Sequence, residues 1–138
     1  MKRSLSNKER RQLGIKSKNA HIQSYKDFEV IVVDGKPLFL VIEGKTLPSL
    51  HNPQIELPSI EVDKGAVPFI LKGAKVLRPG IVDIGNFNKG DSVVVKYQGV
   101  PIAIGIALVG SEEAREMEKG AVIKTVHYKG DALWKGTF

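Results

Sequence analysis

Short segments rich in valine and isoleucine alternate with glycines through the second half of this chain, and this spacing most restricts the fold. Segments of three to seven residues with β-branched side chains favour strands, and glycines beside them favour turns. The pattern therefore predicts a small closed or half-closed β-barrel. The predicted strands are Ile60–Val62, Lys75–Leu77, Ser92–Tyr97, Ile102–Leu108 and Val122–Tyr128, and the glycines are Gly80, Gly85, Gly90, Gly99 and Gly120.

A β-hairpin is predicted earlier in the chain. The segments FEVIVV and PLFLVIE flank Asp34-Gly35, which is the strongest short hairpin signal. Two antiparallel strands are expected at about 28–33 and 37–43. Because an isolated hairpin is marginally stable, it should gain a third strand or a helix, or pack on the segments after it.

Three prolines interrupt the segment between the hairpin and the barrel. Pro48, Pro53 and Pro58 exclude a long helix or a central strand, so residues 44–60 are expected to form an irregular connector with one helical turn near Leu47–Leu50. The predicted domains are a basic arm at 1–18, a small hairpin-containing domain with its proline-rich connector at 19–58, and a β domain at 59–138. The fold class is mainly β with short helices.

The segment from Val62 to Ile81 concentrates positive charge around a short apolar helix. Pro68 is tolerated only in a helix's first turn, so a helix over Ala66–Lys72 is expected, with Gly73 as its left-handed cap. Four cations accompany one acid, Asp63, and small residues at a helix start leave N–H groups free for an anion. The alternative is that the glycines only make turns and the cations are only solvated. The four cations are Lys64, Lys72, Lys75 and Arg78.

The first 18 residues carry the whole formal net charge of the chain, +6, because they hold seven bases and a single acid, Glu9. Such an arm should attract polyanions in a salt-dependent way, although a solvated tail is the alternative. Ser6 and Glu9 have the spacing of a capping box and Gly14 can end a helix, so partial helicity is expected. The bases are Lys2, Arg3, Lys8, Arg10, Arg11, Lys16 and Lys18.

A second helix is expected at Ser111–Lys119, outside the sheet. Ser111 is its predicted N-cap, acidic residues occupy its first turn, and Gly120 follows its end.

Composition argues against several classes of site. The chain has no cysteine and three isolated histidines, so neither a disulfide nor a structural zinc site is expected. Its histidines and aspartates match no nucleophile, metal-binding or nucleotide-binding spacing, and no enzyme activity or cofactor is expected. The longest apolar runs are too short for a membrane span, and the basic N-terminus lacks the apolar run of a signal peptide, so a cytoplasmic protein is expected.

Six pieces in order resemble the PUA domain, an RNA-binding β fold found in pseudouridine synthases and archaeosine transglycosylases. They are DKGA at 63–66, KGAKVLRPGI at 72–81, KGDSVVVKY at 89–97, PIAIGIAL at 101–108, KGAVIKTVHY at 119–128 and GDALW at 130–134. The upstream segment VIVVDGKPLFL, followed by VDKGAVPFILKGA, is similar to the malignant T-cell-amplified sequence family of translation proteins. The chain resembles a short, archaeal-type member of that family.

The resemblance implies RNA contacts on the first helix of the barrel, the strand after it and the end of the last strand. Phe69 and Trp134 could stack on a base, but aromatics among apolar neighbours are usually core, and core is expected for both. The implied contact residues are Lys64, Gly65, Ala66, Phe69, Lys72, Gly73, Lys75, Arg78, His127, Lys129 and Lys135.

The resemblance also implies a function: a non-catalytic protein of translation initiation or ribosome recycling that binds structured RNA, such as tRNA or rRNA. Implied partners are the small ribosomal subunit and a factor like density-regulated protein. Two alternatives stay open: a protein-interaction adaptor for a translation factor, and an accessory subunit that presents RNA to a modifying enzyme. The oligomeric state does not follow from the sequence.

Overall fold

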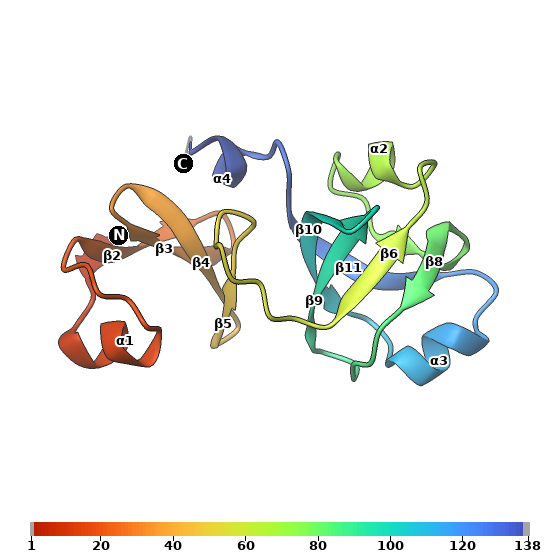
Figure 1. Cartoon of the computed structure of the whole chain (residues 1–138), viewed down its shortest axis with the longest axis horizontal. Coiled ribbons are helices and arrows are strands. Elements are labelled where there is room, and N and C mark those ends of the chain that lie inside the picture. Colours follow the sequence, from red (N-terminus) through yellow and green to blue (C-terminus); the bar gives the residue numbers. More distant parts are fainter. Residues whose placement is uncertain (1, 137–138) are drawn as a thin grey trace.

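The chain contains two β-sheets in the computed structural model, which describes residues 2–136 (Figure 1). The first is an antiparallel sheet whose strand order follows the chain, β1-β2-β3-β4-β5. Its strands are β1 (Lys2–Ser4), β2 (Ala20–Tyr25), β3 (Phe28–Val33), β4 (Lys36–Ile42) and β5 (Lys45–Pro48). The predicted hairpin is β3–β4, and it gains a neighbour on each side.

Positive φ angles explain how the first sheet reverses direction so tightly. Asp34 and Gly35 have φ of 51° and 83°, and Glu43 and Gly44 have φ of 49° and 78°. Two consecutive positive φ angles are typical of a type I′ turn, whose twist suits a hairpin. The second turn connects β4 to β5, a strand that the sequence analysis did not predict.

The predicted helical turn near Leu47–Leu50 is wrong. Leu47 pairs with Leu40 across the β4–β5 ladder and is 1% exposed, and the strand continues to Pro48. Proline is tolerated there because β5 is an edge strand. The irregular connector begins after β5 and leads to the second sheet.

The basic segment at the N-terminus has an ordered structure rather than that of a solvated tail. β1 pairs with β2, Leu5 is buried, and helix α1 (Asn7–Gln12) follows. Its capping box is present: the Ser6 hydroxyl accepts from the Glu9 N–H, and the Glu9 carboxylate accepts from the Ser6 N–H. The predicted partial helicity is confirmed.

The second sheet curls into a nearly closed barrel with the order β7-β11-β10-β9-β6-β8. Its two edge strands, β7 and β8, are separated by only the three residues of the 3-10 turn η1 (Arg78–Gly80), so the sheet's edges must lie close together. The barrel-like fold class is confirmed, whereas β8 was not predicted. The strands are β6 (Ser59–Val62), β7 (Val76–Leu77), β8 (Ile81–Ile84), β9 (Ser92–Tyr97), β10 (Val100–Ala107) and β11 (Ala121–Tyr128).

Three short helices accompany the barrel: α2 (Val67–Ile70), α3 (Ser111–Glu116) and α4 (Ala132–Lys135). The predicted N-cap of α3 is wrong, because Gly110 holds that position. The buried Ser111 hydroxyl instead donates to the Phe87 carbonyl and accepts from the Phe87 N–H. It therefore connects the start of α3 to the segment between β8 and β9. In the described part of the chain, no helix has the length and apolar character needed to cross a membrane.

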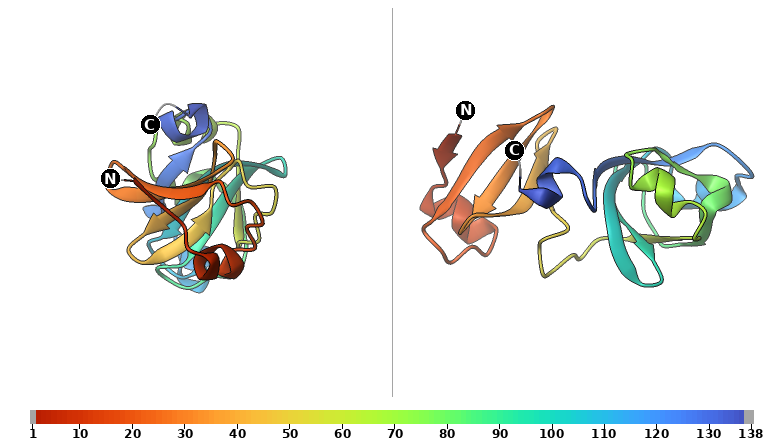
Figure 2. Two further views of the ribbon diagram at one scale, coloured as in Figure 1. Left: turned by 90° about the vertical axis from the view of Figure 1, so that its left-hand side faces the viewer. Right: turned by 90° about the horizontal axis from the view of Figure 1, so that it is seen from above.

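A shared apolar cluster joins the two sheets. Val30, Leu40 and Leu47 of the first sheet belong to the same cluster as Val94 and Ile104 of the barrel. Leu133 of α4, 0% exposed, completes it. Figure 2 shows α4 between the barrel and the first sheet, so the C-terminal helix helps to hold the two together.

Leu133→Ala should therefore lower the free energy of unfolding by about 2–5 kcal/mol, because it opens a cavity in the shared cluster. Urea unfolding followed by circular dichroism measures this change. Leu77→Ala is the matched control, since Leu77 is 54% exposed and its loss should cost less than about 1 kcal/mol. Equal losses in the two variants would contradict the anchoring role of α4.

Candidate functional site

Helix α2 is held in place by the Asp63 loop before it. The Ala66 N–H donates to the Asp63 carboxylate at 2.9 Å, and the Asp63 N–H donates to the Gly80 carbonyl at 2.9 Å. A Cβ on Gly80 would lie 2.9 Å from the Ala66 Cβ, so only glycine permits this approach of η1 to the helix start. These contacts fix α2 opposite β7 and η1.

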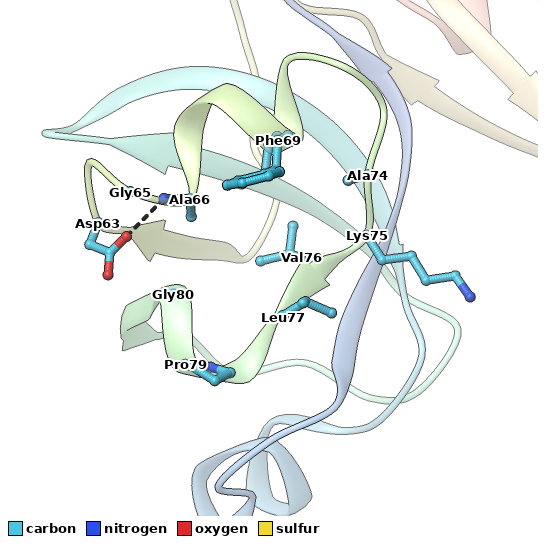
Figure 3. Close-up of a pocket in the computed structure, with 11 residues that line it drawn as sticks. Asp63, Gly65, Ala66, Phe69, Ala74, Lys75, Val76, Leu77, Pro79 and Gly80 are labelled. Atoms are coloured by element: carbon cyan, nitrogen blue, oxygen red, sulfur yellow. Dashed lines mark hydrogen bonds between the residues drawn. The ribbon is translucent and has the colours of Figure 1, made fainter.

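A pocket of about 380 Å³ lies between α2 and the β7–η1 segment (Figure 3). Phe69 extends over it from α2, while Leu77 and Pro79 lie on the opposite side. Most of the lining is apolar, and the Asp63 carboxylate lies at one end. The lining residues are Asp63, Gly65, Ala66, Phe69, Ile70, Ala74, Lys75, Val76, Leu77, Pro79 and Gly80.

Phe69 is not core, contrary to the prediction. It is 65% exposed, whereas the next residue, Ile70, is 1% exposed and packs into the barrel. A single helical turn can bury only one side, and Ile70 takes that side. An exposed phenyl ring at the mouth of an apolar pocket is a surface on which another planar ring can stack.

Three exposed lysines lie on the segments that bound this pocket: Lys64 before α2, Lys72 after it, and Lys75 before β7. Figure 3 shows the Lys75 side chain pointing away from the pocket toward solvent. Within residues 2–136 the ion pairs are Arg3–Glu9 and His127–Asp131, so none of these lysines is neutralised by a carboxylate. The surface combines an apolar pocket with positive charge, and we call it the α2 face.

Arg78 follows β7 but its guanidinium faces another part of the barrel. It donates to the Ala114 carbonyl of α3 at 2.6 Å and to the Ile81 carbonyl at 3.2 Å. Figure 1 shows α3 and α2 on opposite sides of the barrel. Arg78 therefore attaches α3 to the edge of the sheet. The prediction that Arg78 lies with the other cations beside α2 is wrong.

His127 is completely buried, so the prediction that it contacts RNA is wrong. Its Nε2 accepts from the Leu50 N–H at 3.2 Å, which requires the proton to be on Nδ1. Nδ1 in turn donates to the Asp131 carboxylate at 2.8 Å. The ring thus connects β11 to the connector and to α4.

The Asp131 carboxylate accepts hydrogen bonds from three groups: His127 Nδ1, the Tyr128 N–H and the Trp134 N–H. Burial by itself would raise the pKa of Asp131, but the hydrogen bonds from these donors outweigh burial and lower it. Asp131 is therefore the N-cap of α4 as well as the partner of His127.

Lys129, Trp134 and Lys135 lie at the junction with the first sheet. The half-buried Trp134 ring stacks on the His51 ring, with the two ring centroids 4.5 Å apart. The Lys129 ammonium lies 5.7 Å from the centroid of the Trp134 ring. Trp134 therefore belongs to the contact between α4 and the connector, and Lys135 is exposed on α4.

The predicted contact residues thus separate into groups. Lys64, Gly65, Ala66, Phe69, Lys72, Gly73 and Lys75 lie together at the α2 face, and the basic residues of segment 1–18 lie on β1, on α1 and on the segment between α1 and β2. The sequence analysis missed Leu77 and Pro79 as pocket residues. Alternation would have indicated that Leu77 is exposed, because its strand neighbour Val76 is an apolar residue that is 1% exposed and adjacent strand residues point to opposite sides.

Residues 58–129 match the PUA domain. An uncharacterized protein of Methanocaldococcus jannaschii is 38% identical over 125 residues, which cover 86% of this chain and 77% of that protein. Translation machinery-associated protein 20 of Saccharomyces cerevisiae is 34% identical over 74% of this chain and 63% of its own length, so less than two thirds of the yeast protein is matched. Malignant T-cell-amplified sequence 1-A of Xenopus laevis is 30% identical over 82% of this chain and 68% of its own.

Solved structures are also similar. A hypothetical protein of Pyrococcus horikoshii superposes with a TM-score of 0.77 at 29% identity, covering 100% of both chains. A chain of an H/ACA ribonucleoprotein bound to a substrate RNA superposes with a TM-score of 0.52 at 26% identity, covering 56% of this chain and 25% of that chain.

Asp131→Asn should destabilise the protein by about 1–3 kcal/mol at neutral pH, because an amide has a single acceptor oxygen for three donors. Since the pKa of Asp131 is lower in the folded chain than in the unfolded chain, its stabilisation is present in full above the ordinary aspartate pKa and is lost as the pH falls from there through the lower pKa of the folded chain. The stabilities of wild type and variant, measured by urea unfolding, should therefore begin to converge below about pH 4 and meet only below the folded-chain pKa. Asp83→Asn, at an exposed position on β8, is the control and should follow wild type. A constant gap between Asp131→Asn and wild type at every pH would contradict the assignment.

Proposed function

The chain belongs to the PUA domain family, within the group that includes malignant T-cell-amplified sequence 1 and translation machinery-associated protein 20, and we propose that it is a non-catalytic RNA-binding protein of translation. The proposal places RNA on the α2 face. One observation carries it: an exposed phenyl ring and an apolar pocket lie beside lysines that form no ion pair with any carboxylate of residues 2–136.

The chemistry of the α2 face suits RNA that has both a phosphate backbone and an unstacked base. Lysines attract phosphates without reading sequence, and Phe69 offers a stacking surface beside a pocket with room for a ring. Structured RNA such as tRNA or rRNA presents both features. We therefore propose structured RNA as the ligand, recognised by shape and phosphate contacts more than by sequence.

The names of the relatives support the translation part of the proposal. We propose that the protein acts in the cytoplasm at the small ribosomal subunit, during initiation or recycling, with a partner like density-regulated protein. A non-catalytic role fits the state of the buried His127–Asp131 pair. Both ring nitrogens of His127 are already hydrogen-bonded, which leaves neither free to act as a base on a substrate.

The apolar lining of the pocket also favours a second candidate, a protein-interaction adaptor. Phe69 and Leu77 are 65% and 54% exposed, and an apolar side chain of a translation factor could fill the space between them. Such an adaptor would bind with little dependence on salt, whereas RNA binding through lysines would weaken steeply as salt rises.

Replacing Lys64, Lys72 and Lys75 together by alanine should weaken tRNA binding and make the slope of log K against log salt shallower by about one for each phosphate that is no longer neutralised. Fluorescence anisotropy with labelled tRNA measures both quantities. The control replaces Lys26, Lys89 and Lys119, which are exposed on other parts of the molecule and remove the same charge. Equal weakening in both variants would show attraction by net charge alone and would contradict a site at the α2 face.

Phe69→Ala should weaken RNA binding by about 1–3 kcal/mol through the loss of base stacking, while changing stability by less than about 0.5 kcal/mol. Phe69→Tyr should restore binding, because it keeps the ring. Val82→Ala, at a position that is 66% exposed on β8, removes apolar surface elsewhere and serves as the control. RNA affinity unchanged by Phe69→Ala, combined with loss of a protein partner, would favour the adaptor.

A further inference from the structure

A second basic surface lies on the first sheet, around α1. Figure 1 shows α1 and α2 in opposite halves of the molecule along its long axis. A hollow of about 570 Å³ is formed there by α1 and the segment that follows it. Four of the residues around it are cations, and we call this hollow the α1 surface. The cations are Arg10, Arg11, Lys16 and Lys18.

The fold holds the two halves of this surface against each other. The Ile15 N–H donates to the Arg10 carbonyl at 2.8 Å, and the Arg10 guanidinium donates to the Ser17 carbonyl at 3.4 Å. The Ser17 hydroxyl donates to Asp34 at 2.7 Å, which attaches the segment to the β3–β4 turn. Leu13 and Ile15 pack on the apolar cluster beneath. The cations are therefore presented on a folded surface rather than on a loose tail.

Acids near the α1 surface are few, and the closest one in sequence is already paired. Arg3 donates two hydrogen bonds of 2.8 Å to the Glu9 carboxylate. The hydrogen bond from Arg3 is the main reason why the pKa of Glu9 falls to about 2, so at neutral pH this acid is ionised and compensated. Asp34 accepts a hydrogen bond from the Ser17 hydroxyl beside this surface. Among the described residues the ion pairs are Arg3–Glu9 and His127–Asp131, so none of the four cations of the α1 surface forms an ion pair.

We propose that the α1 surface is a second RNA-binding site, which takes the phosphate backbone of a folded RNA. The inference relies on the proposed function only for RNA as the polyanion. The described residues that line the hollow supply guanidinium and ammonium groups but no aromatic ring for a base, so its contacts are with phosphates and carry no sequence information.

An anionic membrane is the competing polyanion, and the distribution of apolar residues disfavours it. Among the residues that the structure describes, the exposed large apolar side chains are Phe69, Leu77, Val82 and Val100, all of them in the barrel domain. Residues 2–58 therefore offer no exposed large apolar side chain that could insert among lipids next to the basic surface.

The test replaces Arg11, Lys16 and Lys18 by alanine in the full chain, since all three are exposed and Arg10 has a structural contact. Binding of a fluorescent tRNA, followed between about 50 and 200 mM salt, should weaken roughly tenfold or more, and the log–log slope should become shallower by about one for each phosphate released. The melting temperature should not change. The matched control is the variant of Lys26, Lys89 and Lys119, which should retain nearly all of the affinity.

The two proposals fail in different ways. If the α1 variant binds as wild type while the variant of Lys64, Lys72 and Lys75 loses affinity, the α1 site is overturned and the α2 face stands. If the α1 variant alone loses affinity, the α1 site stands and the α2 face does not. The α1 site would also be overturned if the control variant lost as much tRNA affinity as the α1 variant. It would likewise be overturned if the wild-type protein bound phosphatidylserine vesicles but not tRNA.

Discussion

The buried carboxylate of Asp131 connects the segments that set the two sheets relative to each other. It begins α4 through the Trp134 N–H and orients the His127 ring, whose other nitrogen accepts from Leu50 in the connector. Leu133, two residues further along, then fills the apolar cluster that both sheets share. A small protein with no disulfide can therefore hold two sheets in one arrangement, because a polar network and an apolar cluster act on the same few residues.

The pocket of the α2 face is a consequence of how the barrel closes. The edge strands β7 and β8 are not paired with each other, and η1 bridges them instead. The glycine at position 80 lets η1 lie against the start of α2, and the space that remains between helix and strand forms the pocket. The same short connection exposes Leu77, so an apolar surface next to lysines arises from barrel geometry.

Local signals in the sequence predicted much of the fold and less of the site. Turn chemistry at Asp34-Gly35 and the capping box at Ser6 depend on neighbours in the chain, and both are present. Three site predictions required tertiary information. Phe69 lies on the outer side of a one-turn helix, Arg78 donates to the carbonyl of Ala114, which is distant in sequence, and His127 is buried where it contacts the connector, also distant in sequence. Spacing alone cannot show which side of a short element faces the core.

The order of strands in the two sheets also bears on how the chain folds as it is synthesised. Every pairing in the first sheet joins consecutive strands, so its contacts are local and can form early. By contrast, β7 pairs with β11, and Ala121 is the partner of Leu77. A chain emerging from the ribosome can thus form its α1 surface well before the pocket. The pocket forms later because β7, which lines it, pairs with β11, the last strand to be synthesised.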